Sequence, residues 1–388
     1  MKKISLIVIG VLVISAFLAG CGGGNKEAES IKVGYLVHVT GDSALWGISE
    51  KNGAIIAQEE INEAGGVLGK KLDIMFYDGR GNSADSVNAV KKAVQQDKVV
   101  AMLGSNLSGP TIAVGPICAS AKVPQVASFA TNPRVTQDDN GNLKPWSFRL
   151  CFTDPYQGKL IADYAYDKLG KKNAAVLYDV TNDYSSGLTD FFVKRFEEKG
   201  GKVVSKLSFR TGDVDFRAQL SEIKQKNADI LVLPNGYKEI ALIAKQAKDL
   251  GMRDIVKISG DSGYSISLFE MAGEELDGNY YVIQHFAWDD PDVAPIKDKY
   301  EKKFNESPEV NAAMGYDMVY FIAEAIKRAG KADGEAIRNA IEESKDVKLK
   351  HASITIDPKT HDPKNKAGII LKFEGNKAVF VDKFAPQD

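Results

Sequence analysis

The sequence is poor in residues that carry metal, redox or covalent chemistry. Three cysteines occur among 388 residues, and none stands in a CxxC pair or a Cys/His cluster, so no zinc site is supported. The four histidines lie in unrelated contexts, and GxSxG, P-loop and HExxH motifs are missing. We therefore expect a protein that needs no metal or cofactor and is not an enzyme.

An excess of positive charge is missing too. The chain has 50 basic and 52 acidic residues, a net charge of −2, and its basic residues form no stripe. This balance argues against a nucleic-acid partner. A hydrophobic content of 44% and a charged content of 26% are typical of a soluble globular protein. Because 388 residues are too many for one small core, we expect two domains.

A short hydrophobic run opens the chain. Residues 4–19 follow two lysines, and the run is too short and wrongly flanked for a spanning helix, which indicates an export signal. The letters "LAGC" end at Cys21 and resemble a lipobox, where bacterial lipoproteins are diacylated; the alternative is a plain signal peptide with an accidental cysteine. We expect residues 1–20 to be a lipoprotein signal peptide and residues 21–30, glycine-rich and polar, to be a flexible tether. Removal of the signal leaves 48 basic and 52 acidic residues, a net charge of −4.

The other two cysteines are Cys118, in an apolar helical stretch, and Cys151, at the end of an apolar run. Export permits a disulfide, but sequence alone does not bring their Cα atoms within bonding range. We favour two buried thiols and leave the pairing open.

Strand and helix patterns alternate from Ile31 onward. A first series runs from "IKVGYLVHV" to "VPQVASFA", and a second of similar length runs from "NAAVLYD" to "IVKISGDS". Strands alternating with helices of ten to fifteen residues predict parallel sheets covered on both faces. The sequence thus predicts two similar α/β lobes. The helices of the last third have no evident sheet of their own, so they need a partner surface.

Polar residues follow several of these strands, where open α/β sheets bind ligands. In "GSNLSGPT", Ser108 lies at or near the start of a helix, where its hydroxyl and nearby amides can bind a carboxylate or simply cap the helix. Thr131 has a similar position after the next strand. Asp261, at a glycine-flanked strand end, can pair with an ammonium group or serve as a turn residue. Tyr184 and Tyr237 also follow strands and can stack on a ligand.

The chain resembles extracytoplasmic solute-binding proteins of the leucine/isoleucine/valine-binding family, which deliver amino acids to ABC transporters. The segments "AIIAQEEINEAGGVLGKKLDIMFYDGRGN", "GSNLSGPT", "VPQVASFATNP" and "GYDMVYFIAEAIKRAG" follow in the family's order, and "INEAGGVLGKKL" is the most distinctive. The resemblance implies the type I periplasmic binding protein fold, two Rossmann-like α/β lobes with a ligand cleft between them. It implies a first lobe of residues 31–151 plus 279–352, and a second of 152–278 plus 353–388.

The resemblance also implies roles for residues that match the family's positions. Ser108 and Thr131 match the side chains that hold the ligand carboxylate, and the carbonyl of Phe129 matches one that receives the ammonium. Asp261 matches the acid of the second lobe, although the best-known members carry glutamate there. The remaining positions match aromatic residues of the cleft, at Trp46, Tyr184 and Tyr237. Leu107 is a further candidate for the wall of the pocket.

Three departures bear on specificity. The "SNLSGPT" loop has fewer serines than in branched-chain binders, Phe129 is bulkier than the usual alanine, and a disulfide of some relatives is not matched by Cys118 and Cys151. We expect a monomeric, lipid-anchored, extracytoplasmic receptor that passes a neutral, aliphatic or branched-chain amino acid to a membrane permease. The alternatives are a receptor of the same fold for an amide, an aromatic acid or a short peptide, and a sensory ligand-binding protein.

Overall fold

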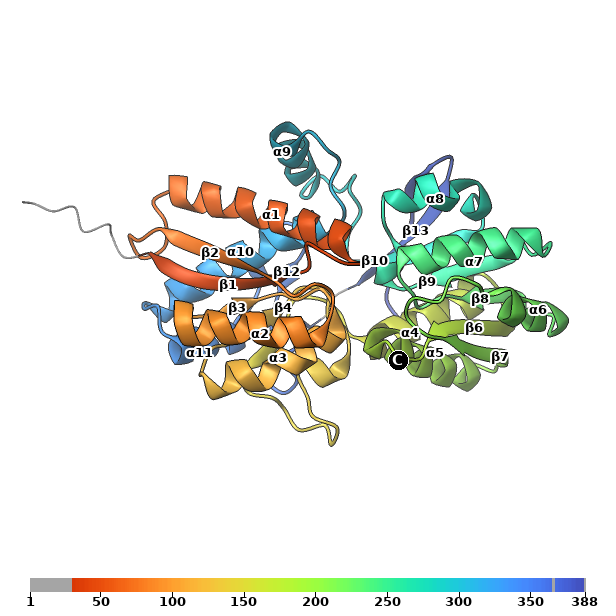
Figure 1. Cartoon of the computed structure of the whole chain (residues 1–388), viewed down its shortest axis with the longest axis horizontal. Helices are drawn as coiled ribbons and strands as arrows, with labels where there is room; N and C mark the ends of the chain where they lie inside the picture. The colour runs from red at the N-terminus through yellow and green to blue at the C-terminus, as the bar shows by residue number, and fades with distance from the viewer. Residues whose placement is uncertain (1–29, 365–366, 387–388) are drawn as a thin grey trace, which may run out of the picture.

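The computed structural model describes residues 30–364 and 367–386. The expected signal peptide, Cys21 and all but the last residue of the expected tether lie outside the described residues. The described chain forms two α/β lobes that lie side by side in Figure 1. Within these ranges, no helix has both the length and the apolar character needed to cross a membrane.

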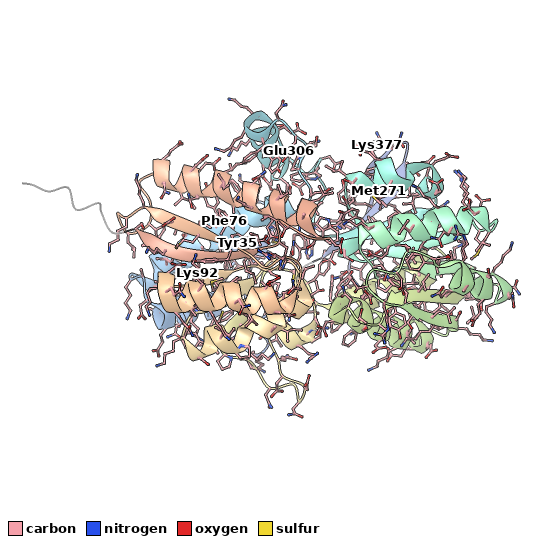
Figure 2. The ribbon with its side chains drawn as sticks, viewed as in Figure 1. Tyr35, Phe76, Lys92, Met271, Glu306 and Lys377 are labelled. Carbon is pink, nitrogen blue, oxygen red and sulfur yellow. The ribbon has the colours of Figure 1, made fainter. Side chains whose placement is uncertain are left out.

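The first lobe is built on a parallel sheet with the strand order β2-β1-β3-β4-β5. Its strands are β1 (Ile31–Val37), β2 (Leu72–Asp78), β3 (Met102–Leu103), β4 (Gln125–Ala127) and β5 (Ser147–Arg149). Tyr35 and Phe76, labelled in Figure 2, are register partners on β1 and β2, and their rings stack with centroids 5.9 Å apart. Most of β1 is buried on both faces, as the near-continuous apolar run predicts.

Helices cover both faces of this sheet. One face packs against α1 (Ala44–Glu63) and α10 (Asn311–Ala329), and the other packs against α2 (Ser83–Lys92) and α3 (Ser108–Ser120). A short π-helix, η1 (Ala93–Asp97), extends α2, and η2 (Pro133–Val135) follows β4. Cys118 of α3 and Cys151 after β5 are both buried, as we expected, with no disulfide between them.

The second lobe repeats the strand order of the first. Its parallel strands follow the order β7-β6-β8-β9-β10, and β13 and β14 extend the sheet in antiparallel fashion. The strands are β6 (Asn173–Asp179), β7 (Lys202–Phe209), β8 (Ile230–Val232), β9 (Val256–Ser259), β10 (Tyr280–Gln284), β13 (Gly368–Glu374) and β14 (Lys377–Phe384). The helices are α4 (Asp154–Asp163), η3 (Tyr164–Lys168), α5 (Asp183–Glu198), α6 (Arg217–Gln225), α7 (Tyr237–Asp249), η4 (Asp261–Gly263) and α8 (Ser267–Leu276).

The C-terminal helices pack on the first lobe, which gives them the partner surface that the sequence requires. They are α9 (Ala294–Phe304), α10 and α11 (Gly334–Glu342), followed by the hairpin of β11 (Val347–Lys348) and β12 (Ser353–Ile354). In Figure 1, α10 and α11 lie with β1 to β4 in the left-hand lobe, whereas β13 lies in the right-hand one. The chain therefore crosses between the lobes three times.

Two of the crossings differ from the expected boundaries at 278/279 and 352/353. Strand β10 pairs with β9 on one side and β13 on the other, so the second sheet continues to Gln284. Beyond β12, Arg149 Nε of the first sheet pairs with Asp362 Oδ1 at 2.6 Å, which keeps the chain on the first lobe until after this residue. Apolar alternation does not reveal such boundaries, because a strand has the same pattern in either sheet.

The contact between α1 and α10 depends on two glycines. A Cβ atom on Gly53 would lie 1.9 Å from the Ala312 carbonyl oxygen, and one on Gly315 would lie 2.1 Å from the Glu50 carbonyl oxygen. The two backbones therefore approach more closely than any other residue type allows. This approach holds α10, in the third of the four parts of the chain, against the first lobe.

Gly53→Ala should therefore destabilise the protein even though alanine favours helix formation. Overpacking against a backbone carbonyl costs about 1–3 kcal/mol and outweighs the gain in helix propensity. Urea unfolding of the mature protein measures the change. Glu63→Ala, an exposed substitution in the same helix, is the control and should change the unfolding free energy by less than about 0.5 kcal/mol. Equal stability of Gly53→Ala and wild type would contradict the close approach.

Candidate functional site

A cleft of about 480 Å³ lies between the lobes, where the carboxyl ends of both parallel sheets face each other. The strand order 2-1-3-4-5 reverses direction between β1 and β3, and again between β6 and β8, which is where open α/β sheets bind ligands. The cleft is lined from the first lobe by the loops after β1, β2 and β3, and from the second by the loops after β6, β8 and β9. The fold thus brings loops far apart in sequence to one cavity.

Ser108 lies at the first-lobe wall of this cleft. It is the first residue of α3, and the residue at the cap position, Leu107, makes no side-chain cap. The Ser108 hydroxyl does not cap its own helix; it accepts a hydrogen bond from the Asn132 backbone N–H at 3.3 Å. The alternative explanation of Ser108 as a helix cap is therefore wrong. Its remaining hydrogen-bonding capacity and the amides of the α3 N-terminus suit an anionic group.

Asp261 lies at the opposite wall, at the start of η4, and is 7% exposed. Its backbone is held at both ends, because its N–H donates to Gln157 Oε1 at 3.0 Å and its carbonyl accepts from Gln284 Nε2 at 2.6 Å. Its carboxylate Oδ2 lies 3.1 Å from His285 Nε2. The carboxylate is thus fixed in one orientation beside the cavity.

His285 connects this carboxylate to the apolar wall of the cleft. Its ring stacks on Phe152 with centroids 3.8 Å apart, and it meets the edge of Phe129 at 5.0 Å. Phe129 itself lines the cleft and is partly buried. The bulky residue at position 129 therefore packs against the group that orients Asp261.

Aromatic side chains bridge the lobes at the same cleft. The Trp46 indole N–H of α1 donates to the Tyr264 carbonyl at 3.2 Å, and the Trp46 ring meets the Tyr237 ring edge-on at 5.1 Å. Beside them, Lys238 Nζ pairs with Asp42 Oδ1 at 2.9 Å. These contacts join residues about 200 positions apart, so the two lobes touch across the cleft.

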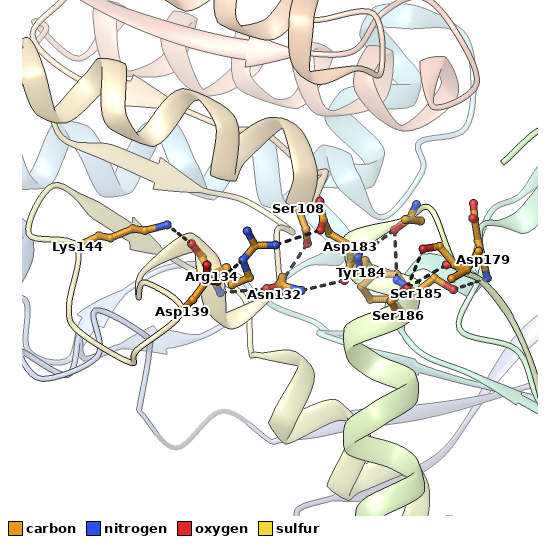
Figure 3. A network of polar contacts seen from close by, with 12 residues as sticks. Ser108, Asn132, Arg134, Asp139, Lys144, Asp179, Asp183, Tyr184, Ser185 and Ser186 are labelled. Carbon is orange, nitrogen blue, oxygen red and sulfur yellow. Dashed lines mark hydrogen bonds and ion pairs between the residues drawn. The ribbon is translucent and has the colours of Figure 1, made fainter. Parts of the chain in front are cut away.

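A polar network joins the two lobes at Asp183, which lines the cleft, as Figure 3 shows. Asn132 Nδ2 of the first lobe donates to the Asp183 carbonyl at 2.8 Å, and Arg134 lies 3.4 Å from the Asp183 carboxylate. On the second lobe, Asn182 caps α5 by accepting from the backbone N–H groups of Tyr184 and Ser185. The N-termini of α3 and α5 therefore meet at the cleft.

Thr131 differs from the other expected ligand residues. It is fully buried and is not among the residues that line the cleft. Its hydroxyl lies instead beside the carboxyl of Asp154, at the start of α4. Burial raises the pKa of this fully buried carboxyl to about 8; the Thr131 hydroxyl and Arg149 oppose the rise, and the charge of Asp261 adds to it.

Seven of the eight expected ligand residues line the cleft, and Thr131 lies behind it. The seven are Trp46, Leu107, Ser108, Phe129, Tyr184, Tyr237 and Asp261. Tyr184 is almost fully buried, and burial together with the charge of Asp261 raises its pKa well above the usual value for tyrosine. Among the residues that the structure describes, no group of three or more His, Cys, Asp or Glu side chains could hold a metal ion.

Sequence reasoning missed His285, Asp154 and Tyr264. His285 follows β10, which was assigned to the wrong lobe, so nothing placed it near Asp261. Asp154 is an acidic residue in the first turn of a helix. Many exposed helices have such a residue, so the pattern did not single it out. Tyr264 contributes its backbone carbonyl, which no side-chain pattern reveals.

Comparison with known proteins agrees with this geometry. Residues 30–371 match the family model described as periplasmic binding protein. The chain is 29% identical over 374 residues to Leu/Ile/Val-binding protein homolog 1 of Brucella suis, covering 96% of this chain and 97% of that protein. It is 32% identical to the crystal structure of the leucine-binding protein LivK of Thermotoga maritima, with a TM-score of 0.84 and coverages of 92% and 99%. It is 29% identical to LivJ of Streptococcus pneumoniae in complex with isoleucine, with a TM-score of 0.84 and coverages of 92% and 100%.

The protein is a bilobed ligand-binding protein with the type I periplasmic binding protein fold. Its two lobes have the same strand order, the chain crosses between them three times, and a cleft lies between them. The chain belongs to the periplasmic binding protein family. The family and fold implied by the resemblance are confirmed.

Asp154→Asn should change how stability depends on pH. The folded-state pKa of this carboxyl, about 8, lies above its ordinary value of 3.8. The folded state therefore favours the protonated acid. As the pH rises between these two values, Asp154 destabilises the wild-type fold more and more, and the effect levels off above pH 8. Asparagine resembles the protonated form, so its melting temperature relative to wild type should increase from pH 5 to pH 8.

Thermal unfolding of the ligand-free proteins from pH 5 to pH 9 measures this difference. Asp254→Asn, at a carboxylate that is 93% exposed, is the control and should follow wild type throughout. A constant difference between Asp154→Asn and wild type at all pH values would show that Asp154 is ionised in the fold.

Proposed function

We propose that this protein captures an L-amino acid with a neutral, aliphatic or branched side chain in the cleft between its lobes and delivers it to an ABC-transporter permease. The observation that carries the proposal is the placement of Ser108 and Asp261 on opposite lobes of one cavity. A zwitterion has an anionic and a cationic end, and these two residues offer a partner to each. Relatives named for leucine, isoleucine and valine binding, one of them solved with isoleucine, support the choice of ligand class.

The α-carboxylate would lie at the N-terminus of α3, where the Ser108 hydroxyl and backbone amides donate to it. The α-ammonium would lie against the Asp261 carboxylate. Each hydrogen bond to a charged group contributes about 1.5–3 kcal/mol net, so three or four reach about the 8 kcal/mol of a micromolar complex. Trp46, Leu107 and Phe129 supply the apolar surface for the side chain.

Closure of the lobes would couple binding to delivery. Asp261 and Tyr237 belong to the second lobe and Ser108 to the first, so a ligand that contacts all three is bound tightly only when the lobes are together. A ligand stabilises the closed form by the difference in its affinity for the two forms. The closed shape then reports an occupied cleft to the permease. This role involves no catalysis.

Binding of L-leucine, L-isoleucine or L-valine to the mature protein, measured by isothermal titration calorimetry, tests the proposal. We expect micromolar or tighter affinity for at least one of them, and Asp261→Ala should weaken it by at least about tenfold, because the buried ammonium loses its charged partner. Asp254→Ala, at an exposed acid of the same lobe, is the control and should bind like wild type.

Two results of these titrations would contradict the proposal. If none of the common amino acids binds while an amide, an aromatic acid or a short peptide does, the ligand class is wrong. Unchanged affinity in Asp261→Ala would remove this residue from the site.

We also propose that the protein is a monomer held on the outer face of the cell membrane by lipid on Cys21. The letters "LAGC" after a short hydrophobic run support this anchor, since lipobox cysteines are diacylated after cleavage. Family membership supports the extracytoplasmic location.

Cys21→Ala should release the protein from membranes, because it removes the acceptor of the lipid. Fractionation of cells that express the full chain measures this. Cys118→Ala is the control, because Cys118 is buried in α3 and should leave anchoring unchanged. Membrane retention of Cys21→Ala would mean that the lipobox interpretation is wrong.

A further inference from the structure

One buried histidine joins the loops that form the first-lobe wall of the cleft. His38 follows β1 directly and is fully buried. Its Nε2 lies 3.0 Å from Ser105 Oγ, in the loop after β3, and its Nδ1 accepts a hydrogen bond from the Gly81 N–H, in the loop after β2, at 3.0 Å. Because Nδ1 is an acceptor here, the ring hydrogen is on Nε2, which donates to Ser105. The neutral imidazole thus connects three neighbouring loops.

The Ser105 hydroxyl, in turn, shapes the loop that leads to Ser108. It accepts from the Leu107 N–H at 3.0 Å and donates to the Leu107 carbonyl at 3.2 Å, while it accepts the hydrogen of His38. The Thr111 hydroxyl of α3 donates to the same Leu107 carbonyl at 2.7 Å. Ser105 is itself fully buried. The direction in which Leu107 and Ser108 face the cleft therefore depends on the Ser105 hydroxyl.

Two glycines allow other segments to approach His38 closely. A Cβ atom on Gly47 of α1 would lie 2.1 Å from the His38 carbonyl oxygen, and one on Gly79 would lie 2.7 Å from the ring. The same position on Gly79 is 2.3 Å from Ser86 Oγ of α2. The charged group that acts on the ring is Asp78, whose carboxylate accepts from the Thr40 hydroxyl and from backbone N–H groups. Helix α1 therefore packs closely on the His38 backbone, and the Gly79 backbone packs closely on its ring.

We propose that His38 is a positioning residue for ligand binding: its neutral imidazole holds the Ser105 hydroxyl, and through it orients the loop that presents Ser108 to the ligand. It touches no ligand itself, because it is not among the residues that line the cleft. The inference rests on the proposed function for its effect on affinity, but its effect on the loops is independent of any ligand. No motif in the sequence points to His38, which is one of four unrelated histidines.

The role requires an uncharged ring. A proton on Nδ1 would face the Gly81 N–H and remove the acceptor that holds the loop after β2. Burial lowers the pKa of His38 from 6.5 to about 4, although Asp78 and the Gly79 backbone oppose this shift. The unfolded chain therefore takes up the proton first, so the stabilising effect of His38 is complete above pH 6.5 and is lost as the pH falls toward 4.

Two substitutions separate positioning from simple packing. His38→Gln keeps one acceptor and one donor and does not titrate, whereas His38→Phe keeps a ring and loses both. His351→Gln is the control, because His351 is buried in the same lobe against Asp317 and is not among the residues that line the cleft. Hydrogen exchange of the ligand-free proteins and calorimetry with L-leucine are the two measurements.

We expect His38→Phe to speed exchange at the Gly81 and Leu107 amides and to raise the Kd for L-leucine roughly tenfold at pH 7, as expected for lost buried hydrogen bonds. His38→Gln should restore both, and its melting temperature relative to wild type should rise from pH 7 to pH 5. Wild-type exchange at both amides in His38→Phe would overturn the proposal, as would an unchanged Kd. If wild type binds no amino acid, the proposed function fails, and exchange alone decides on His38.

Discussion

A carboxylate buried at the meeting of two lobes places the strongest physical demand on this structure. An ionised group loses several kcal/mol of hydration when it is buried, and recovers it only from well-placed partners. Asp261 therefore has its backbone bound by Gln157 and Gln284, and its carboxylate bound by His285. These partners come from α4, from the end of β10 and from the segment after it, so the site requires β10 to pair within the second sheet. The ammonium group of a ligand would complete the set.

The first-lobe wall has the opposite polarity, because it presents hydrogen-bond donors to an anionic group. Parallel strands bring helix N-termini to one edge of the sheet, and α3 begins there with Ser108. The loop before α3 has little regular structure, and buried hydrogen bonds from His38 through Ser105 give it a defined shape. In our proposal, the two walls are thus matched to the two ends of a zwitterion, and closure through Trp46, Tyr264, Asn132 and Asp183 brings them together.

The two-lobe fold and seven residues of the cleft could be predicted from sequence, because alternating strands and helices repeat in two series, polar residues follow the strands, and the family resemblance adds further positions. Sequence did not reveal that β10 belongs to the second sheet, since its apolar residues suit either sheet. That error hid His285. Thr131 was placed by its position after a strand and by the resemblance, and its hydroxyl lies beside Asp154, a contact that depends on how α4 approaches the first lobe. Side-chain direction at a lobe boundary is a tertiary property that local pattern does not encode.

The crystal structure of the mature protein in complex with L-leucine tests the central claim most directly. The account predicts the α-carboxylate at the N-terminus of α3, with an oxygen about 2.7–3.1 Å from the Ser108 hydroxyl, and the ammonium within a similar distance of the Asp261 carboxylate. The side chain should lie against Trp46, Leu107 and Phe129. A ligand with its ammonium at Ser108, or one bound outside this cleft, would contradict the account.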